Sequence, residues 1–196
     1  MKNNQSILKE WGITEQELTD LVNQNPSLRG MLLGYIAEHK FQKLFLDDPK
    51  ITATTKDDDH DRTKKGDRRI IYKRKSFTIE VKSLQTHTIK KISDNSWEGK
   101  AQVDGSDRRI VTFVDGTQLN TTLLLRGEFD ILAVNCFAFE NKWRFAFCKN
   151  SDLPVSTFKK YSQLQRERLI ASLIPVTWSP KPPFTDNLFK ILNAML

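Results

Sequence analysis

The chain has 196 residues, of which 38% are apolar and 28% are charged, and its formal net charge is +7. This composition is that of a globular protein with one sizeable core, and it excludes a disordered chain. No apolar run reaches the roughly 18 residues of a membrane-spanning helix, and MKNNQSILKEWG lacks the apolar centre of a signal peptide. We therefore expect a cytoplasmic protein with no membrane partner, in which Cys136 and Cys148 remain reduced.

The basic charge is concentrated in one part of the sequence. Residues 60–100 contain 12 Lys and Arg against 5 Asp and Glu, and this surplus of 7 equals the net charge of the chain. Such a surplus is typical either of a solvated basic face or of a surface that binds a polyanion. Nucleic acid is the first candidate for such a partner.

The first part of the chain predicts helices. Residues 1–26 are expected to form a short helical lead-in, in which Thr14 and Glu17 have the spacing of a capping box. A longer helix is predicted over 28–46, and it places Glu38 on the same face as several apolar residues. A carboxylate on an inner face is unusual, so Glu38 is either a functional residue or one member of a buried ion pair.

A hairpin and a sheet are predicted next. A strand at 51–55 is followed by two β-rich runs at 67–72 and 77–82, joined by a turn at 73–76. The remaining expected elements are β structure at 100–114, a short helix at 117–126, paired strands at 129–137 and 142–148, a helix from Ser156 or Thr157 to about Leu173, and a helix from Thr185.

These elements predict a single α/β domain over residues 1–196, with a central mixed β-sheet flanked by α-helices. Within it, residues 84–127 form an insert that is a candidate for DNA contact, and residues 180–196 supply a C-terminal helix.

Charged residues interrupt the second strand of the predicted hairpin. Alternate residues of a strand point to one face, so Glu80 and Lys82 are expected side by side while Val81 points into the core. Asp67 begins the neighbouring strand, and the turn returns it to the end that carries Glu80. Two carboxylates this close suit Mg²⁺, and an adjacent lysine can act on a water and balance phosphate charge. The pattern therefore predicts a site for phosphodiester hydrolysis.

Two other segments have a similar triplet. Glu140-Asn141-Lys142 follows Asp130, but Asn141 is expected in a turn, so its neighbours need not share a strand face. Asp48-Pro49-Lys50 lies at a helix end with proline at its centre. Only Glu80-Val81-Lys82 lies inside a β-rich run with an acidic partner one strand away.

The order of Glu38 (in GYIAEHKF), Asp67 and Glu80-Val81-Lys82 resembles the PD-(D/E)xK nuclease superfamily, most closely a small type II restriction endonuclease. The resemblance covers residues 28–84, with Gly66 in the place of the pattern's proline, and it implies a restriction-endonuclease-like core.

The resemblance also implies roles for these residues. Asp67, Glu80 and the backbone carbonyl of Val81 would bind Mg²⁺, for which Mn²⁺ can substitute. Lys82 would act on the attacking water, and Glu38 would support the metal through water. Asp57, Asp58, Asp59 and Asp61 lie just upstream, and Asp61 is the alternative to Asp67.

Several polar residues are candidates for DNA contact. Arg62, Lys64 and Lys65 lie beside the active-site strand and could hold phosphates. Gln85 is expected to face the substrate. The segment Ser106-Asp107-Arg108-Arg109 could offer arginine to guanine edges, or it could be a charged hairpin tip.

The function expected from this resemblance is a Mg²⁺-dependent endonuclease that hydrolyses double-stranded DNA, of the sequence-specific type II restriction kind. One site cuts one strand, so a homodimer is expected. A cognate DNA methyltransferase would belong to the same system. The alternatives are a structure-selective nuclease of the Holliday-junction or repair type, a catalytically inert DNA-binding module on the same fold, and a globular protein whose basic patch binds an acidic protein.

Overall fold

The computed structural model describes residues 6–56 and 66–196. These residues divide into two compact units, one within residues 1–36 and the other within residues 37–196. The boundary falls inside the longest helix, α3 (Pro26–Phe41). Each unit is considered separately below.

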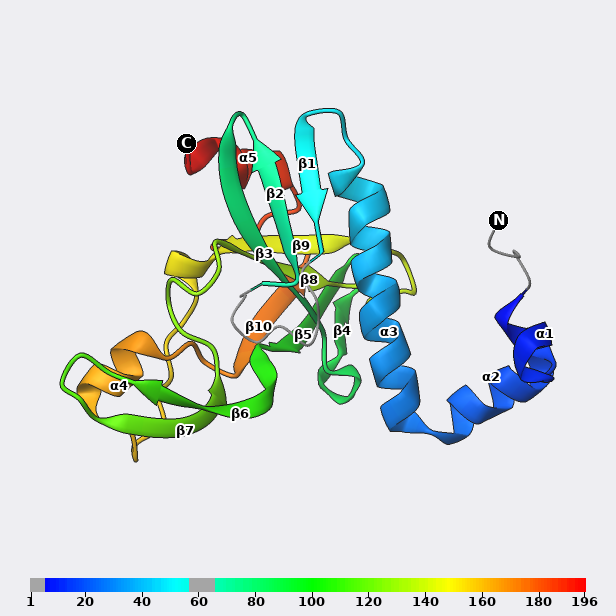
Figure 1. The fold of residues 1–196 in the computed structure, drawn as a ribbon, viewed down its shortest axis with the longest axis horizontal. Helices are drawn as coiled ribbons and strands as arrows, with labels where there is room; N and C mark the ends of the chain where they lie inside the picture. Colours follow the sequence, from blue (N-terminus) through cyan, green and yellow to red (C-terminus); the bar gives the residue numbers. More distant parts are fainter. Residues whose placement is uncertain (1–5, 57–65) are drawn as a thin grey trace. The chain divides into compact units, whose positions relative to one another are not determined.

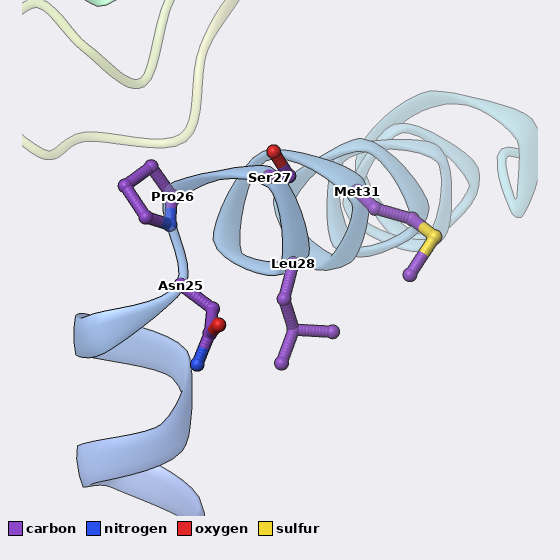
Figure 2. A pocket seen from close by; sticks show the side chains of 5 residues that line it. All are labelled: Asn25, Pro26, Ser27, Leu28 and Met31. Carbon is purple, nitrogen blue, oxygen red and sulfur yellow. The ribbon is translucent and has the colours of Figure 1, made fainter.

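The N-terminal unit is helical. It contains α1 (Ile7–Trp11), α2 (Glu15–Gln24) and the first part of α3, and neither α1 nor α2 has a buried residue. The predicted capping box is confirmed, because the Thr14 hydroxyl accepts from the Glu17 N–H while the Glu17 carboxylate accepts from the Thr14 N–H. A pocket at the bend between α2 and α3 is lined by Asn25, Pro26, Ser27, Leu28 and Met31 (Figure 2), none of which is an acid or a base.

The C-terminal unit is built on a five-stranded mixed sheet with the order β1-β2-β3-β8-β9 (Figure 1). Its strands are β1 (Ile51–Thr55), β2 (Arg68–Tyr72), β3 (Lys75–Ser83), β8 (Ile131–Asn135) and β9 (Phe145–Lys149). Neighbouring strands are antiparallel except β3 and β8, which run parallel. The predicted α/β class and mixed central sheet are therefore confirmed, and β8, which is apolar except for Asn135, is buried along its whole length.

The hairpin turn is tighter than expected. Lys73 and Arg74 alone form it, with φ of 47° and 68°, whereas Lys75 and Ser76 already belong to β3. Two residues at positive φ are characteristic of the turn whose twist matches that of a hairpin. The shorter turn fixes the pairing of Tyr72 with Lys75, and with it the register of every residue toward the site.

The two faces of the central sheet are covered differently. One face packs against the end of α3, the π-helical turn Gln42–Leu46 that follows it, and α5 (Leu188–Ala194), through residues such as Phe41, Leu46 and Ile191. The other face packs against a second sheet, β10-β5-β4, through Ala101, Ile174 and Val176. The strands of this second sheet are β4 (Lys90–Ser93), β5 (Ser96–Gln102) and β10 (Leu173–Trp178), and a 3-10 turn at Thr86–Thr88 precedes them.

Two predicted helices are wrong. Residues 117–126 form a strand, β7 (Gln118–Leu123), which pairs with β6 (Asp104–Thr112) as a separate ribbon. Between Ser156 and Leu173 only α4 (Gln163–Arg168) is helical, and Ser162 caps it. Leu169 and Ile170 instead form bridges to Leu125 and Val155, so long-range pairing outweighs the helical spacing of the apolar residues.

The ribbon is attached to the unit through its inner face. Val111 and Phe113 pack against Leu169, with Tyr161 and Leu164 beside them. Figure 1 shows β6 and β7 next to α4, projecting from the central sheet. The chain reaches β9 through the predicted turn at Glu140-Asn141, and a 3-10 turn at Asn150–Asp152 follows β9.

Candidate active site

Asp67 lies immediately before β2, and its side chain extends the pairing between β2 and β3. The backbone N–H of Val81 donates to Oδ2 of Asp67 at 2.7 Å. Gly66, just before it, has a φ of 83°, and a Cβ there would lie 3.3 Å from the Ile79 carbonyl oxygen. Proline, whose φ is fixed near −65°, cannot take this conformation, so a glycine at this position has a local reason.

Glu80 and Lys82 lie side by side on β3, as predicted. Oε1 of Glu80 is 2.6 Å from Nζ of Lys82, and both side chains are largely buried. Leu132 and Val134, which pair with these two residues, belong to the core beneath the second sheet. Glu80 and Lys82 therefore point to the face that the second sheet covers, while Ile79 and Val81 belong to the opposite core.

The field around this pair is negative. Burial, and then the charges of Asp67 and Glu128, raise the pKa of Glu80 to about 7 although Lys82 acts to lower it. Burial acts to lower the pKa of Lys82, but the charges of Glu80, Asp67 and Asp104 outweigh it, and the pKa of Lys82 is raised. Both groups therefore hold their protons more tightly than usual, Glu80 mainly because it is buried and Lys82 because of the acidic groups around it.

Glu38 belongs to a different cluster. Its Oε2 lies 3.0 Å from Nζ of Lys56 and 3.7 Å from Nη2 of Arg68. Burial is the main reason that the pKa of Glu38 is raised, and the charge of Asp67 adds to it. The ion-pair interpretation of Glu38 is thus the one that the geometry favours, with Lys56 and Arg68 as its partners.

Asp67 links the two clusters. Arg68 pairs with Ile79 across the hairpin, so Arg68 and Glu80 point to opposite faces of the sheet. The hydrogen bond from the Val81 N–H to Asp67 runs from strand to strand within the sheet, and so it lies between these two faces. Asp67 therefore acts electrostatically on Glu38, Glu80 and Lys82 alike.

The other predicted DNA-binding residues differ in their environments. Gln85 follows β3 and its amide donates to the side chain of Gln102. The segment 106–109 lies within β6, where Asp107 and Arg108 are exposed. Arg109 is held inward, 2.5 Å from Oε2 of Glu128, and it also donates to the Leu123 carbonyl. Arg109 is therefore engaged within the protein, whereas Arg108 beside it is exposed.

Some predicted residues cannot be placed. Arg62, Lys64 and Lys65 lie outside the described residues, as do Asp57, Asp58, Asp59 and Asp61. The side chain of Ser106 is likewise outside them.

The rejected triplet is part of a turn, as expected. Glu140 and Asn141 have φ of 78° and 55°, and the Glu140 carboxylate lies 2.6 Å from Nη2 of Arg144. Asp130, its supposed partner, accepts hydrogen bonds from the N–H and hydroxyl of Thr78. The choice of Glu80-Val81-Lys82 over Glu140-Asn141-Lys142 is therefore consistent with the fold.

The carboxylate oxygens of Asp67 and Glu80 are of the type that a hard cation such as Mg²⁺ prefers. Oδ2 of Asp67 accepts from the Val81 N–H, and Oε1 of Glu80 pairs with Lys82. Within residues 6–56 and 66–196, no group of three or more His, Cys, Asp or Glu side chains is placed to hold a metal ion. Mg²⁺ commonly uses one or two carboxylates, completed by water and substrate phosphate, so a pair of carboxylates is chemically suited to it.

Sequence reasoning missed three groups near the site. Glu128 and Asp104 act electrostatically on Glu80 and Lys82 although they lie far away in the chain. Arg68, at 9% exposure, is buried against Glu38. Glu128, between two strands, and Asp104, the first residue of β6, gave no periodic signal, whereas an Arg in an alternating strand at an inward position could have been noticed.

No family model, curated protein or solved structure matches this chain. Among the described residues, no helix has both the length and the apolar character needed to cross a membrane.

Proposed function

We propose that the protein is a Mg²⁺-dependent endonuclease that hydrolyses double-stranded DNA, of the PD-(D/E)xK type II restriction kind, and that it acts as a homodimer. The observation that carries this proposal is the hydrogen bond from the Val81 N–H to Asp67. It fixes a second carboxylate next to the buried Glu80–Lys82 pair. A simple structural ion pair needs no such neighbour, because an added negative charge raises the cost of burying Glu80.

The residues divide the chemistry among them. Asp67 and Glu80 would hold Mg²⁺ with the Val81 carbonyl, and the bound cation would supply positive charge to the phosphate oxygens as the reaction proceeds. Lys82 carries its ammonium beside Glu80, where it can donate to a phosphate oxygen and orient the attacking water. The basic surplus of residues 60–100 favours a polyanionic substrate.

Plasmid digestion tests the function. We expect supercoiled plasmid incubated with Mg²⁺ to become linear fragments, and EDTA to stop the reaction. Sequencing the ends should find 5′-phosphates at one short motif, which is the signature of a sequence-specific enzyme. Cleavage of four-way junctions of any sequence with linear duplex spared would replace the restriction proposal by the junction alternative. Absence of cleavage in Mg²⁺ and Mn²⁺, with salt-sensitive DNA binding retained, would favour the inert module.

Mg²⁺ should also stabilise the protein without DNA, and more strongly at high pH. The pKa of folded Glu80 is about 7 against an ordinary value of 4.5. The stability that its protonation contributes is therefore full below pH 4.5 and is lost as the pH rises through about 7. The free energy of unfolding should therefore be lower above pH 7 than below pH 4.5.

Denaturant unfolding, at one pH below 4.5 and one above 7, measures this effect. We expect Mg²⁺ to restore stability at the higher pH only, because the cation competes with the proton for Glu80. The Glu80→Gln variant is the control, since it should show neither the loss nor the recovery. An equal effect of Mg²⁺ at both pH values, or the same effect in the variant, would contradict a site at Glu80.

A further inference from the structure

The β6–β7 ribbon has two faces of different character. The pairs Ile110–Asn120 and Thr112–Gln118 alternate with the pair Val111–Leu119 across it. Cross-strand partners share a face, so the first two pairs lie on one side and the third on the other. Val111 is buried, whereas Ile110 is 68% exposed. One face thus anchors the ribbon and the other is open.

The open face carries side chains of the types that can pair with base edges. Gln118 and Asn120 are exposed there, as is Arg108 on the adjoining part of β6. Arginine pairs with guanine, and asparagine and glutamine pair with adenine, each through two hydrogen bonds in the major groove. Ile110 and Val114, the latter 93% exposed, add apolar surface that can contact thymine methyl groups.

These polar groups are available for such contacts. Among the described residues, no hydrogen bond or ion pair engages the side chains of Arg108 and Asn120, and Gln118 makes only a 3.4 Å contact with the Thr112 hydroxyl. Arg109 provides the contrast, because Glu128 holds it on the inner side. The ribbon therefore presents one arginine outward and uses its neighbour to fix the strand.

Positive charge flanks the anchored side of the ribbon. Tyr161 and Leu164, which pack against it, lie in a segment that also carries Lys159, Lys160, Arg166 and Arg168 against the single acidic residue Glu167. Lys159, Lys160 and Arg168 are exposed. Such a segment suits the phosphates that border a groove, and phosphate contacts set the position of a base-reading element.

We propose that the open face of the β6–β7 ribbon enters the major groove of duplex DNA and that Arg108, Gln118 and Asn120 read base edges there. The major groove is wide enough for a two-stranded ribbon. This inference rests on the proposed function in one respect only, namely that duplex DNA is the substrate. It assigns sequence reading to residues 108–120, which are separate from Asp67 and Glu80, the carboxylates that would hold the metal.

Selection from a pool of random-sequence duplexes tests the proposal by binding alone. The protein carries Glu80→Gln and Lys82→Met so that bound DNA stays intact. We expect it to enrich one short motif. Arg108→Ala should reduce the preference at a G·C pair by about 10-fold or more, and Gln118→Ala with Asn120→Ala should do the same at A·T pairs. Affinity for the unselected pool should change much less.

Two controls accompany the selection. Arg29→Ala removes an exposed arginine from the N-terminal unit and should leave the motif unchanged. Thermal unfolding of each ribbon variant should match the parent protein, because the replaced side chains are exposed.

The outcomes separate the two proposals. If the ribbon variants enrich the parent's motif unchanged, or if the parent enriches none, the ribbon does not read sequence. If cleavage fails but the motif depends on Arg108, the nuclease proposal falls and the ribbon proposal stands. A third variant combines Arg108→Ala, Gln118→Ala and Asn120→Ala with an intact active site. If it cuts a plasmid at the same ends as the wild type, the ribbon proposal falls and the nuclease proposal stands.

Discussion

Replacing Glu80 by Gln and Lys82 by Met in the same molecule should reduce Mg²⁺-dependent cleavage by on the order of 1,000-fold or more. The double change removes one metal ligand and the ammonium that acts on the attacking water. It leaves two neutral side chains of similar length at positions that are buried and 2.6 Å apart in the native pair. Conversion of supercoiled plasmid with time measures the loss.

The double variant is preferable to Lys82→Ala, although the single change should also abolish cleavage. Removing Lys82 alone leaves Glu80 buried without its partner, and breaking a buried pair in this way typically costs about 3–5 kcal/mol. Replacing both charges is often neutral or stabilising. The melting temperature and DNA affinity should therefore stay near those of the wild type. Wild-type cleavage by the double variant would mean that the pair is structural and that the site lies elsewhere.

Asp67→Asn should lower cleavage by on the order of 100-fold or more, because one charged ligand is lost. The asparagine carbonyl can still accept from the Val81 N–H, which Asp67 now does at 2.7 Å, so the end of the hairpin is kept. Initial rates at saturating DNA and a thermal unfolding curve measure the two properties separately.

Asp61→Asn is the matched comparison for Asp67→Asn, since Asp61 is the alternative first carboxylate. We expect this variant to cut DNA at close to the wild-type rate. The reverse pattern, with Asp61→Asn inactive and Asp67→Asn active, would move the metal ligand to Asp61. Inactivation by Glu140→Ala would instead point to the rejected triplet.

The site was predictable to the extent that it depends on neighbours in the chain. The alternation of β3 places Glu80 and Lys82 side by side whatever surrounds them, and the hairpin brings Asp67 to the same end. The environment of Glu38 was less predictable. Its helix was expected correctly, but Lys56 and Arg68 reach it through the packing of β1 and β2, which no local pattern reports.

Residues 84–127 show more clearly the difference between what local patterns predict and what long-range contacts decide. Gln118-Leu119-Asn120-Thr121-Thr122 contains apolar and polar residues in an order that suited either a short helix or a strand. Pairing with β6 decided the matter, because it satisfies the backbone of both strands and buries Val111 and Phe113 against Leu169. Arg108 and Arg109 are neighbours of the same type, yet only their places on the two faces of the ribbon give them different roles.

The sequence by itself determined the α/β class, the hairpin, the capping box at Thr14 and the Glu80–Lys82 pair, because local spacing controls each of them. Only the tertiary structure decided that a second sheet packs against the face of the central sheet to which Glu80 points. It also decided that Arg109 pairs with Glu128 and that residues 118–123 form a strand. These features depend on contacts between residues distant in the chain. Such contacts form when buried surface and backbone hydrogen bonds outweigh local preference, and local preference is what a single sequence displays most directly.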